Sequence, residues 1–411
     1  MNLADKTARP SRICCLDLDC FFVSVERLFD PTLEGKPVVV GAKPGTRGVV
    51  TAASYEVRRY GVRSGMPIAE AVRRAPHAIF VRPRHGVYSE YSALVRKIVD
   101  RYSPSVQAAS IDEFYVDFAG CEKIYTRPSD RDADDAILRT VRVLTATIQK
   151  ELGLPSSAGI GSCKAVAKVA CRLAKPRGVL MVPGGTEREF LGPLPVGILP
   201  GIGPVAERKL STLGINTLGQ LAEADPSLLR RQFGKWATVL VESARGIGPA
   251  GLGSDRPAFR EHDPEGYAAG SLSNECTLSK DSTDESELLG VLSGLCERVC
   301  YRARKRRVRA CTVTLKLRFS DFTTITRSRS IAPTNSELEL LPVLKRLFFE
   351  NARGRAVRLL GVALHRLRPE KEQLGLFECH ERLHLAVDEL RKRFGYGSVR
   401  LAESRSRWNR R

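Results

Sequence analysis

Two acidic clusters in the sequence contain residues that could hold metal ions. Asp17 lies in CCLDLDCFF, and Asp112 and Glu113 lie together in ASIDEFYVD. Each cluster falls at the end of a predicted strand, and such ends can converge in a βαβ-type sheet. Buried carboxylates need a compensating cation or hydrogen-bond network, and hard oxygen ligands in a basic protein point to Mg²⁺ rather than zinc. The alternative is that all three are ordinary turn residues at strand ends.

Three convergent carboxylates would suit two-metal phosphoryl transfer from a nucleoside triphosphate. Asp112 and Glu113 are neighbours and would face opposite sides of a flat strand, so they can share a metal only if the chain twists between them. No G-x-x-x-x-G-K-[ST] loop is present, so scattered cations must neutralise the phosphates. A helix in SYEVRRYGVRSGMP would place Tyr55 and Arg58 on one face. Lys164 begins another predicted helix, where its charge and the helix dipole act together.

The elements that must position these residues follow from hydrophobic periodicity. The first 175 residues predict the order strand, helix, strand, strand, helix, strand, which is the split βαβ arrangement. About seventy residues with their own short strands interrupt this order after the first strand, which predicts an inserted subdomain. The predicted elements are strand 13–17, short strands 37–41 and 48–53, helix 88–102, strands 106–109 and 111–118, helix 134–152, strand 157–160 and helix 164–174.

Length and charge narrow the class of protein. A chain of 411 residues predicts two to four packed units, and a net charge of +20 favours a nucleic-acid partner over a merely solubilising surface. The 11 cysteines include no C-x-x-C pair and are expected to be reduced. Cys379, His380 and His384 lack a fourth zinc ligand and are interpreted as helix surface. Without a signal peptide or membrane span, a cytoplasmic protein with no membrane partner is expected.

Five motifs in order resemble one family closely. LDLDCFFVSVE, SYEVRRYGVRSGMP, SIDEFYVD, AGIGSCKAVAKVACRLAKP and LPGIG are similar to motifs of the Y-family translesion DNA polymerases, in the DNA polymerase IV branch, from about residue 12 to 400. The resemblance implies an α+β multidomain fold with a split βαβ (ferredoxin-like) palm, inserted small fingers, a helical helix-hairpin-helix thumb and an α/β little finger. The implied boundaries are palm 12–21 and 87–174, fingers 22–86, thumb 175–249, little finger 262–368 and C-terminal tail 369–411.

The resemblance also implies roles for individual residues. Asp17, Asp112 and Glu113 would be the catalytic ligands of two Mg²⁺ ions, with the backbone carbonyl of Leu18 helping one ion and Asp19 not a ligand. The implied nucleotide-binding residues are Phe22, as a steric gate against ribonucleotides, and Tyr55, Arg58 and Lys164, as triphosphate contacts. The implied reaction is template-directed addition of deoxynucleotides from dNTPs to a primer, with low fidelity, without proofreading, in DNA damage tolerance. Unlike many relatives, this chain has Ala52 in place of a threonine and Phe114 after the catalytic pair.

Primer-template DNA is expected to meet two surfaces. Gly201, Ile202 and Gly203 in LPGIG fit a helix-hairpin-helix turn whose backbone N–H groups approach a phosphate, although a plain helix-helix turn is the alternative. The densest basic stretch spans residues 296–331. In it, alternation predicts that one strand face packs while the other presents cations to the duplex. The predicted DNA-binding cations are Lys316, Arg318, Arg327 and Arg329.

The predicted tail contains QLGLF, which resembles a sliding-clamp (β clamp) binding peptide. Its recognition residues would be Gln373, Leu374, Leu376 and Phe377, and packing against the little finger is the alternative. Truncation after Arg368 is expected to remove clamp stimulation and spare the active site. An apolar stripe on a basic helix follows, without an identifiable docking site: Leu383, Val387, Leu390 and Phe394. A monomer is expected.

Two rival functions remain open from the sequence. One is a non-catalytic accessory protein of the same fold, although the presence of Asp17, Asp112 and Glu113 argues against it. The other is a helix-hairpin-helix repair protein without polymerase activity, which would make the nucleotide-binding residues coincidental. Primer extension with Mg²⁺ and dNTPs would separate all three.

Overall fold

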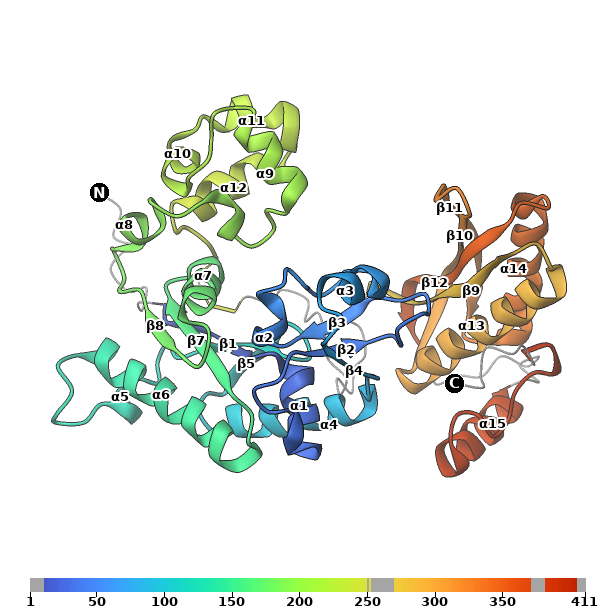
Figure 1. Cartoon of the computed structure of the whole chain (residues 1–411), viewed down its shortest axis with the longest axis horizontal. Helices are drawn as coiled ribbons and strands as arrows, with labels where there is room; N and C mark the ends of the chain where they lie inside the picture. Colours follow the sequence, from blue (N-terminus) through green and yellow to red (C-terminus); the bar gives the residue numbers. More distant parts are fainter. Residues whose placement is uncertain (1–10, 250, 253–269, 371–380, 405–411) are drawn as a thin grey trace. The chain divides into compact units, whose positions relative to one another are not determined.

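The structure of the chain is a computed structural model that describes residues 11–249, 251–252, 270–370 and 381–404. It divides into two compact units, one formed by residues 1–44 and 49–259 and the other by residues 45–48 and 260–411 (Figure 1). The first unit contains the predicted palm, fingers and thumb, and the second contains the predicted little finger. No helix in the described ranges is both long and apolar enough to cross a membrane.

The palm is a five-stranded sheet with strand order β5-β6-β1-β7-β8. Strand β1 runs antiparallel to both β6 and β7, as a split βαβ unit requires, so the predicted palm fold is confirmed. Its strands are β1 (Ile13–Leu18), β5 (Ser105–Ala108), β6 (Glu113–Asp117), β7 (Ser156–Gly161) and β8 (Val179–Met181). Its helices are α4 (His85–Val99), α5 (Glu122–Tyr125), α6 (Ala133–Leu152) and α7 (Lys164–Ala174).

Helices cover both faces of the palm sheet, and β1 shows why. Its side chains alternate between two cores: Leu16 packs with residues of α4 and α6, whereas Cys15 packs with residues of α7. Helix α7 crosses β7 so closely that a Cβ on Gly159 would lie 2.0 Å from the backbone nitrogen of Cys171. Helix α7, which carries Lys164 and Lys168 and is followed by Lys175, is therefore held close to the strands that carry the carboxylates.

The insertion between β1 and α4 forms the fingers. A small sheet of order β3-β2-β4 has its own apolar core, which includes Val39, Val50 and Ile68. The elements are α1 (Phe21–Phe29), η2 (Pro31–Leu33), β2 (Val38–Gly41), β3 (Val50–Ala53), α2 (Tyr55–Arg58), α3 (Ile68–Arg74) and β4 (Ile79–Val81). Ser54 caps α2 by accepting a bond from the N–H of Val57, which places Tyr55 at the first position of that short helix.

The thumb is helical and packs around leucine side chains such as Leu210 and Leu240. Its elements are α8 (Glu187–Leu191), η3 (Val196–Ile198), α9 (Pro204–Ser211), α10 (Leu218–Glu223), α11 (Pro226–Phe233) and α12 (Trp236–Ala244). Gly201, in the turn before α9, has φ of +94°, and a Cβ there would lie 2.9 Å from the Trp236 ring. Both observations require glycine at this turn.

The little finger is a four-stranded sheet of order β11-β10-β12-β9 with α13 and α14 on one face. The core on that face joins β10 residues such as Leu315 and Leu317 to Leu292 of α13 and Leu344 of α14. The elements are β9 (Ser271–Ser282), α13 (Glu285–Lys305), β10 (Val308–Phe319), β11 (Thr324–Thr334), α14 (Glu337–Ala352), β12 (Val357–Pro369), α15 (Glu381–Phe394) and η4 (Ala402–Ser404).

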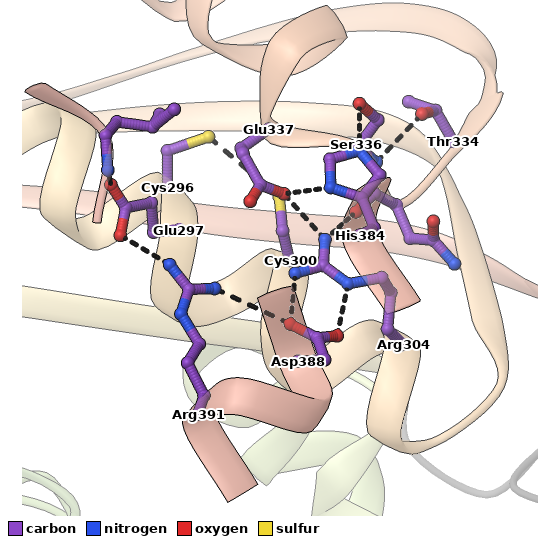
Figure 2. Close-up of polar contacts among 12 residues, drawn as sticks. Cys296, Glu297, Cys300, Arg304, Thr334, Ser336, Glu337, His384, Asp388 and Arg391 are labelled. Carbon is purple, nitrogen blue, oxygen red and sulfur yellow. Dashed lines mark hydrogen bonds and ion pairs between the residues drawn. The ribbon is translucent and has the colours of Figure 1, made fainter. Parts of the chain in front are cut away.

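The C-terminal helix α15 docks on the little finger through polar side chains (Figure 2). Asp388 pairs with Arg304, Arg391 pairs with Glu297, and His384 bonds to the Ser336 hydroxyl at 2.9 Å. The apolar stripe predicted on this helix does not provide the contact, because Leu383, Leu390 and Phe394 remain exposed. Residues 381–404 are therefore part of the folded second unit, and the docking site that the sequence did not identify for this helix lies on the little finger.

Candidate active site

The three predicted carboxylates meet where the two central palm strands run side by side. Asp17 of β1 lies opposite Glu113 of β6 in the strand register. The N–H of Leu18 donates to the carbonyl of Asp112 at 2.9 Å, so Asp112 also lies beside β1. Residues 95 positions apart in sequence are thus adjacent in the sheet, as strand pairing predicted.

The chain turns immediately before β6, so Asp112 does not follow the alternating side-chain directions of that strand. The N–H groups of Ala109 and Ser110 both donate to the carbonyl of Glu113, at 2.9 and 3.2 Å. Two residues thus share one acceptor, and Asp112 lies in the turn while Glu113 begins the strand. The hydroxyl of Ser110 also bonds to the Asp112 carboxylate. The predicted break between the two neighbouring carboxylates is therefore present.

Two lysines that the sequence analysis did not select contact these carboxylates. Lys175 pairs with Asp17, and Lys168 pairs with Glu113. Lys168 lies on α7 and Lys175 follows its last residue, so one helix delivers both ammonium groups. Burial raises the pKa of Asp17 to about 6; Lys175 opposes this effect, and the charges of Asp112 and Glu113 add to it. The seven-residue spacing of Lys168 and Lys175 indicated that the two side chains lie on the same side of one helix. It did not indicate which strands these lysines contact.

The three carboxylates could bind a cation, although Asp17 and Glu113 are paired with Lys175 and Lys168 in the structure. The Oε1 atom of Glu113 is buried and has no hydrogen-bond partner, whereas its Oε2 atom contacts Lys168. Among the residues described, no three His, Cys, Asp or Glu side chains already form a metal-binding group. A buried acceptor without a partner costs free energy, and an all-oxygen donor set suits a hard divalent cation. Metal binding here would require Lys175 to move from Asp17.

Asp19 has a different environment from Asp17. It is buried and accepts bonds from the Tyr55 hydroxyl at 2.8 Å, the Ser157 hydroxyl at 2.8 Å and the N–H of Arg177 at 2.9 Å. Both of its oxygens are thus occupied by protein donors, in agreement with the expectation that Asp19 is not a metal ligand. Its bond to Tyr55 ties the fingers to the palm.

The predicted phosphate contacts, Tyr55, Arg58 and Lys164, have different partners in the structure. The Arg58 guanidinium lies 4.8 Å from the centroid of the Tyr55 ring and donates to the carbonyl of Ala53 at 3.0 Å. Burial is the main reason that the pKa of Tyr55 is raised, and the Asp19 charge adds to it. Lys164, by contrast, donates to the carbonyl of Leu252 at 2.6 Å. The structure therefore pairs Tyr55 with Arg58 but gives the carboxylates to Lys168 and Lys175 rather than to Lys164.

Phe22 is not an ordinary core residue like its neighbour. Phe21 is buried, whereas Phe22 is only partly buried and stacks on the ring of Tyr88, with centroids 4.0 Å apart and planes 14° apart. The chain turns sharply before both residues, because Cys20 has φ of +46° at the junction of β1 and α1. This turn connects β1, which carries Asp17, to helix α1, which carries Phe22.

The little-finger sheet separates its predicted cations onto two faces. Lys316 and Arg318 alternate with buried Leu315 and Leu317, so they lie on the face without helices, as expected. Arg327 lies opposite Leu315 in the register and donates to Asn351 of α14.

Arg329 likewise lies opposite Val313 and pairs with Glu350 of α14 at 3.8 Å. The prediction that Arg327 and Arg329 continue the cationic face is wrong, because the hairpin register places them on the helix side.

The three predicted DNA-binding residues of the thumb turn differ in exposure. Ile202 is buried in the thumb core, whereas Gly201 and Gly203 are exposed.

Comparisons with known proteins agree along the length of the chain. The impB/mucB/samB family matches residues 16–172, its HHH motif matches residues 185–215, and its C-terminal domain matches residues 269–376. DNA polymerase IV of Dehalococcoides mccartyi is 38% identical over 394 residues, covering 94% of this chain and 96% of that protein.

Solved structures are similar as well. A Y-family DNA polymerase chimera superposes with a TM-score of 0.73 at 25% identity, covering 87% of this chain and 99% of the chimera. An insertion ternary complex of Dbh DNA polymerase gives a TM-score of 0.60 at 25% identity, covering 86% and 98% of the two chains. The chain therefore belongs to the impB/mucB/samB family, within the DNA polymerase IV branch of the Y-family DNA polymerases.

Proposed function

We propose that this translesion DNA polymerase adds deoxynucleotides through two Mg²⁺ ions held by Asp17, Asp112, Glu113 and the carbonyl of Leu18. The observation that carries the proposal is the convergence of three carboxylates in which Glu113 keeps a buried oxygen without a partner. When bound, the ions would lower the pKa of the primer hydroxyl and neutralise the triphosphate. The chain's own contribution is to hold the carboxylates beside the primer end and to provide cations for the phosphates.

Lys175, Tyr55 and Arg58 are the cations and donors that we assign to the triphosphate. Lys175 contacts Asp17 in the structure, so its ammonium is within a side-chain movement of the phosphates of a nucleotide bound there. Tyr55 and Arg58 lie on helix α2 of the fingers, where Tyr55 bonds to Asp19 and Arg58 lies over the Tyr55 ring. Lys164 stays a prediction as a triphosphate contact, and its bond to the Leu252 carbonyl gives it a separate, structural explanation.

Phe22 is assigned as the steric gate that rejects ribonucleotides. Its ring is only partly buried and is stacked on Tyr88, so it can exclude a 2′-hydroxyl by contact. This supports the gate over the alternative of a core phenylalanine.

We assign primer-template binding to the thumb turn and to the open face of the little finger. Glu275 and Leu359 also lie on that face, and Glu275 pairs with Lys316. The other side chains around Lys316 and Arg318 are small or hydroxyl-bearing, which permits close approach of a phosphate backbone. They are Ser273, Thr277, Thr314, Thr324, Thr326, Ser328, Gly361 and Ala363. In the thumb, Gly201 and Gly203 present backbone without Cβ atoms, as a phosphate-binding hairpin requires.

The clamp peptide is also part of the proposal, and its residues lie outside those that the structure describes: Gln373, Leu374, Leu376 and Phe377. Truncation after Arg368 does not test the clamp peptide alone, because it would also remove α15, so that buried Glu297 would lose its bonds to Arg391 and to the N–H of Leu401 and Arg304 would lose its pair with Asp388. The better test is Gln373→Ala combined with Phe377→Ala. It should abolish stimulation by the sliding clamp, and equal stimulation of the parent and the variant would show that the peptide has another role.

Low fidelity without proofreading, a monomeric state and a cytoplasmic location complete the proposal. The palm, fingers, thumb and little finger account for the described ranges, and none of these ranges forms an additional nuclease domain. Incubation with a 3′-mismatched primer and Mg²⁺ should therefore release no terminal nucleotide. Release that disappears with Asp17→Asn would contradict this part of the proposal.

Primer extension tests the central proposal. Purified protein with primer-template, dNTPs and Mg²⁺ should extend the primer, and a chelator or Glu113→Gln should stop extension. The accessory-protein alternative predicts no extension by the parent protein. Extension that persists in Glu113→Gln at the parental rate would overturn the metal assignment. The helix-hairpin-helix repair alternative is disfavoured because the palm and little finger both match the polymerase family.

A further inference from the structure

The ring of Phe22 belongs to a set of contacts between helices α1 and α4, which lie side by side in Figure 1. Phe22 and Glu26 are one turn apart on α1, and Arg84 and Tyr88 are one turn apart at the start of α4. The Tyr88 ring stacks on Phe22 while its hydroxyl donates to Glu26 at 2.6 Å. One tyrosine therefore connects the ring of Phe22 to a carboxylate of the same helix.

Glu26 is a buried carboxylate with both oxygens bonded. It is 4% exposed, and its Oε1 atom accepts from the Tyr88 hydroxyl and from Arg84 Nε at 3.0 Å. Its Oε2 atom accepts from Arg84 Nη2 at 2.5 Å, which completes a two-pronged ion pair. A carboxylate removed from water needs such partners, and their fixed geometry in turn fixes what they touch. Tyr88, which is 0% exposed, is held at its hydroxyl by this ion pair.

The position of Tyr88 decides whether Phe22 can move. A steric gate discriminates only if its ring resists displacement by the extra oxygen of a ribonucleotide. Tyr88 lies flat against one face of the ring, and His85 contacts it edge-on with centroids 6.1 Å apart. Movement of the Phe22 ring away from a 2′-hydroxyl on the Tyr88 side therefore requires Tyr88 to move, and Glu26 prevents that movement.

We propose that Glu26, acting through Tyr88, is a positioning residue for sugar discrimination between deoxyribonucleoside and ribonucleoside triphosphates. The inference rests on the proposed role of Phe22 as the steric gate. Neither residue is assigned contact with the nucleotide. Weakening the bond between Glu26 and Tyr88 should let the Phe22 ring move, so the incorporation of ribonucleotides should rise relative to that of deoxyribonucleotides.

The experiment measures kcat/KM for dNTP divided by kcat/KM for the matching rNTP, in three variants. Phe22→Ala removes the gate and should lower this ratio most. Tyr88→Phe keeps the stacked ring and removes only the hydroxyl, and Glu26→Gln removes the charge while keeping the volume. Each should lower the ratio by about tenfold, equivalent to roughly 1.4 kcal/mol. Adding Tyr88→Phe to Phe22→Ala should lower the ratio no further, because the supported ring is already gone.

Two matched controls lie elsewhere in the palm. Tyr125→Phe removes a tyrosine hydroxyl that donates to the Tyr102 carbonyl at 2.8 Å. Asp130→Asn disrupts another two-pronged pair, in which Arg139 bonds to both carboxylate oxygens at 2.9 and 2.7 Å. Both should leave the ratio at the parental value, whereas general loosening of the fold would change it in the controls as well.

The outcomes separate the inference from the gate assignment. If Phe22→Ala leaves the ratio unchanged, Phe22 is not the gate, and the inference fails with that assignment. If Phe22→Ala lowers the ratio while Tyr88→Phe and Glu26→Gln leave it parental, the gate stands and the inference alone is overturned. Tyr88→Phe loses no ring volume, so it keeps the test decisive if Glu26→Gln folds poorly.

Discussion

Two buried glutamates, Glu113 in the palm and Glu297 in the little finger, each form an ion pair but differ in how completely the carboxylate is bonded. In the little finger, Glu297 and Arg391 are each 1% exposed at the side chain. Glu297 bonds to Arg391 through one oxygen and to the N–H of Leu401, at 2.8 Å, through the other. In the palm, Glu113 pairs with Lys168 through one oxygen only, and its second oxygen is buried without a partner.

The difference shows how a buried carboxylate can be assigned to structure or to chemistry. A carboxylate whose acceptors are all bonded has part of its desolvation cost offset by protein donors, and no oxygen is left for a ligand. A carboxylate with an unpartnered acceptor retains part of that cost, and a ligand can recover it. The little-finger glutamate should therefore report on stability and the palm glutamate on activity.

The largest effect that sharpens this comparison is expected from Asp112→Ala. Removing one of three metal-binding carboxylates should lower nucleotide addition by more than about 10³-fold, because both ions depend on the shared set. Primer-template affinity should stay within about threefold of the parent, since it comes mainly from the basic surfaces. Single-turnover extension and a fluorescence binding titration measure the two quantities. Substantial extension by this variant would contradict the two-metal assignment.

The matching change in the little finger is Arg391→Ala, which should act on stability. It leaves buried Glu297 without its ion-pair partner, and breaking such a pair costs about 3–5 kcal/mol. Thermal unfolding followed by calorimetry should show a lower melting temperature for the second unit, while extension at low temperature persists.

Lys392→Ala is the control for this experiment, because that side chain is 77% exposed on the same helix. It should unfold like the parent protein. An Arg391→Ala protein that melts like the control would show that α15 contributes nothing to the stability of the little finger.

Sequence patterns predicted the positions of helices and strands better than they predicted which side of each element is buried. Helix α7 begins at Lys164 and ends at Ala174 as expected, because its periodicity and Pro176 are local signals. The polar docking face of α15 was missed because an amphipathic pattern predicts that the apolar side of a helix is buried. In the structure the ion-pairing side chains of α15 contact the little finger, and the apolar side chains Leu383, Leu390 and Phe394 are exposed. Such pairing depends on residues about ninety positions away in the sequence, so no local pattern contains it.

The same limit applied at the active site. Asp17, Asp112 and Glu113 were selected because carboxylates at the ends of buried strands need a compensating cation and because the family resemblance assigned them to the metal site, but Lys168 and Lys175 resembled the other lysines of a basic protein. Their contacts depend on how closely α7 crosses the sheet at Gly159, which is a tertiary property.

A smaller effect is expected from comparing Lys175→Ala with Lys164→Ala. Lys175 contacts Asp17, so its removal should raise the KM for dNTP by about tenfold, the effect of losing roughly 1.4 kcal/mol of charge-assisted binding. Lys164 bonds to a backbone carbonyl, and its removal should change the KM by less than about threefold. Steady-state kinetics at saturating primer-template separates the two. A larger effect from Lys164→Ala would confirm the prediction that Lys164 contacts the triphosphate and would give Lys175 a smaller role.

The smallest expected effect compares the two faces of the little-finger sheet. Arg318 lies on the face without helices, whereas Arg327 lies opposite Leu315 and bonds to Asn351 of α14. If duplex DNA meets the open face, Arg318→Ala should weaken binding about threefold and reduce the slope of log affinity against log salt by about one, as expected for one lost phosphate contact. Arg327→Ala should leave the slope unchanged, because its charge is on the helix side. Titrations at several salt concentrations measure both slopes.

If Arg327→Ala lowers the slope as much as Arg318→Ala does, the duplex reaches around the edge strand β11 to the helix side, and the face assignment is wrong. Equal parental slopes in both variants would instead place the phosphate contacts on the thumb turn at Gly201 and Gly203.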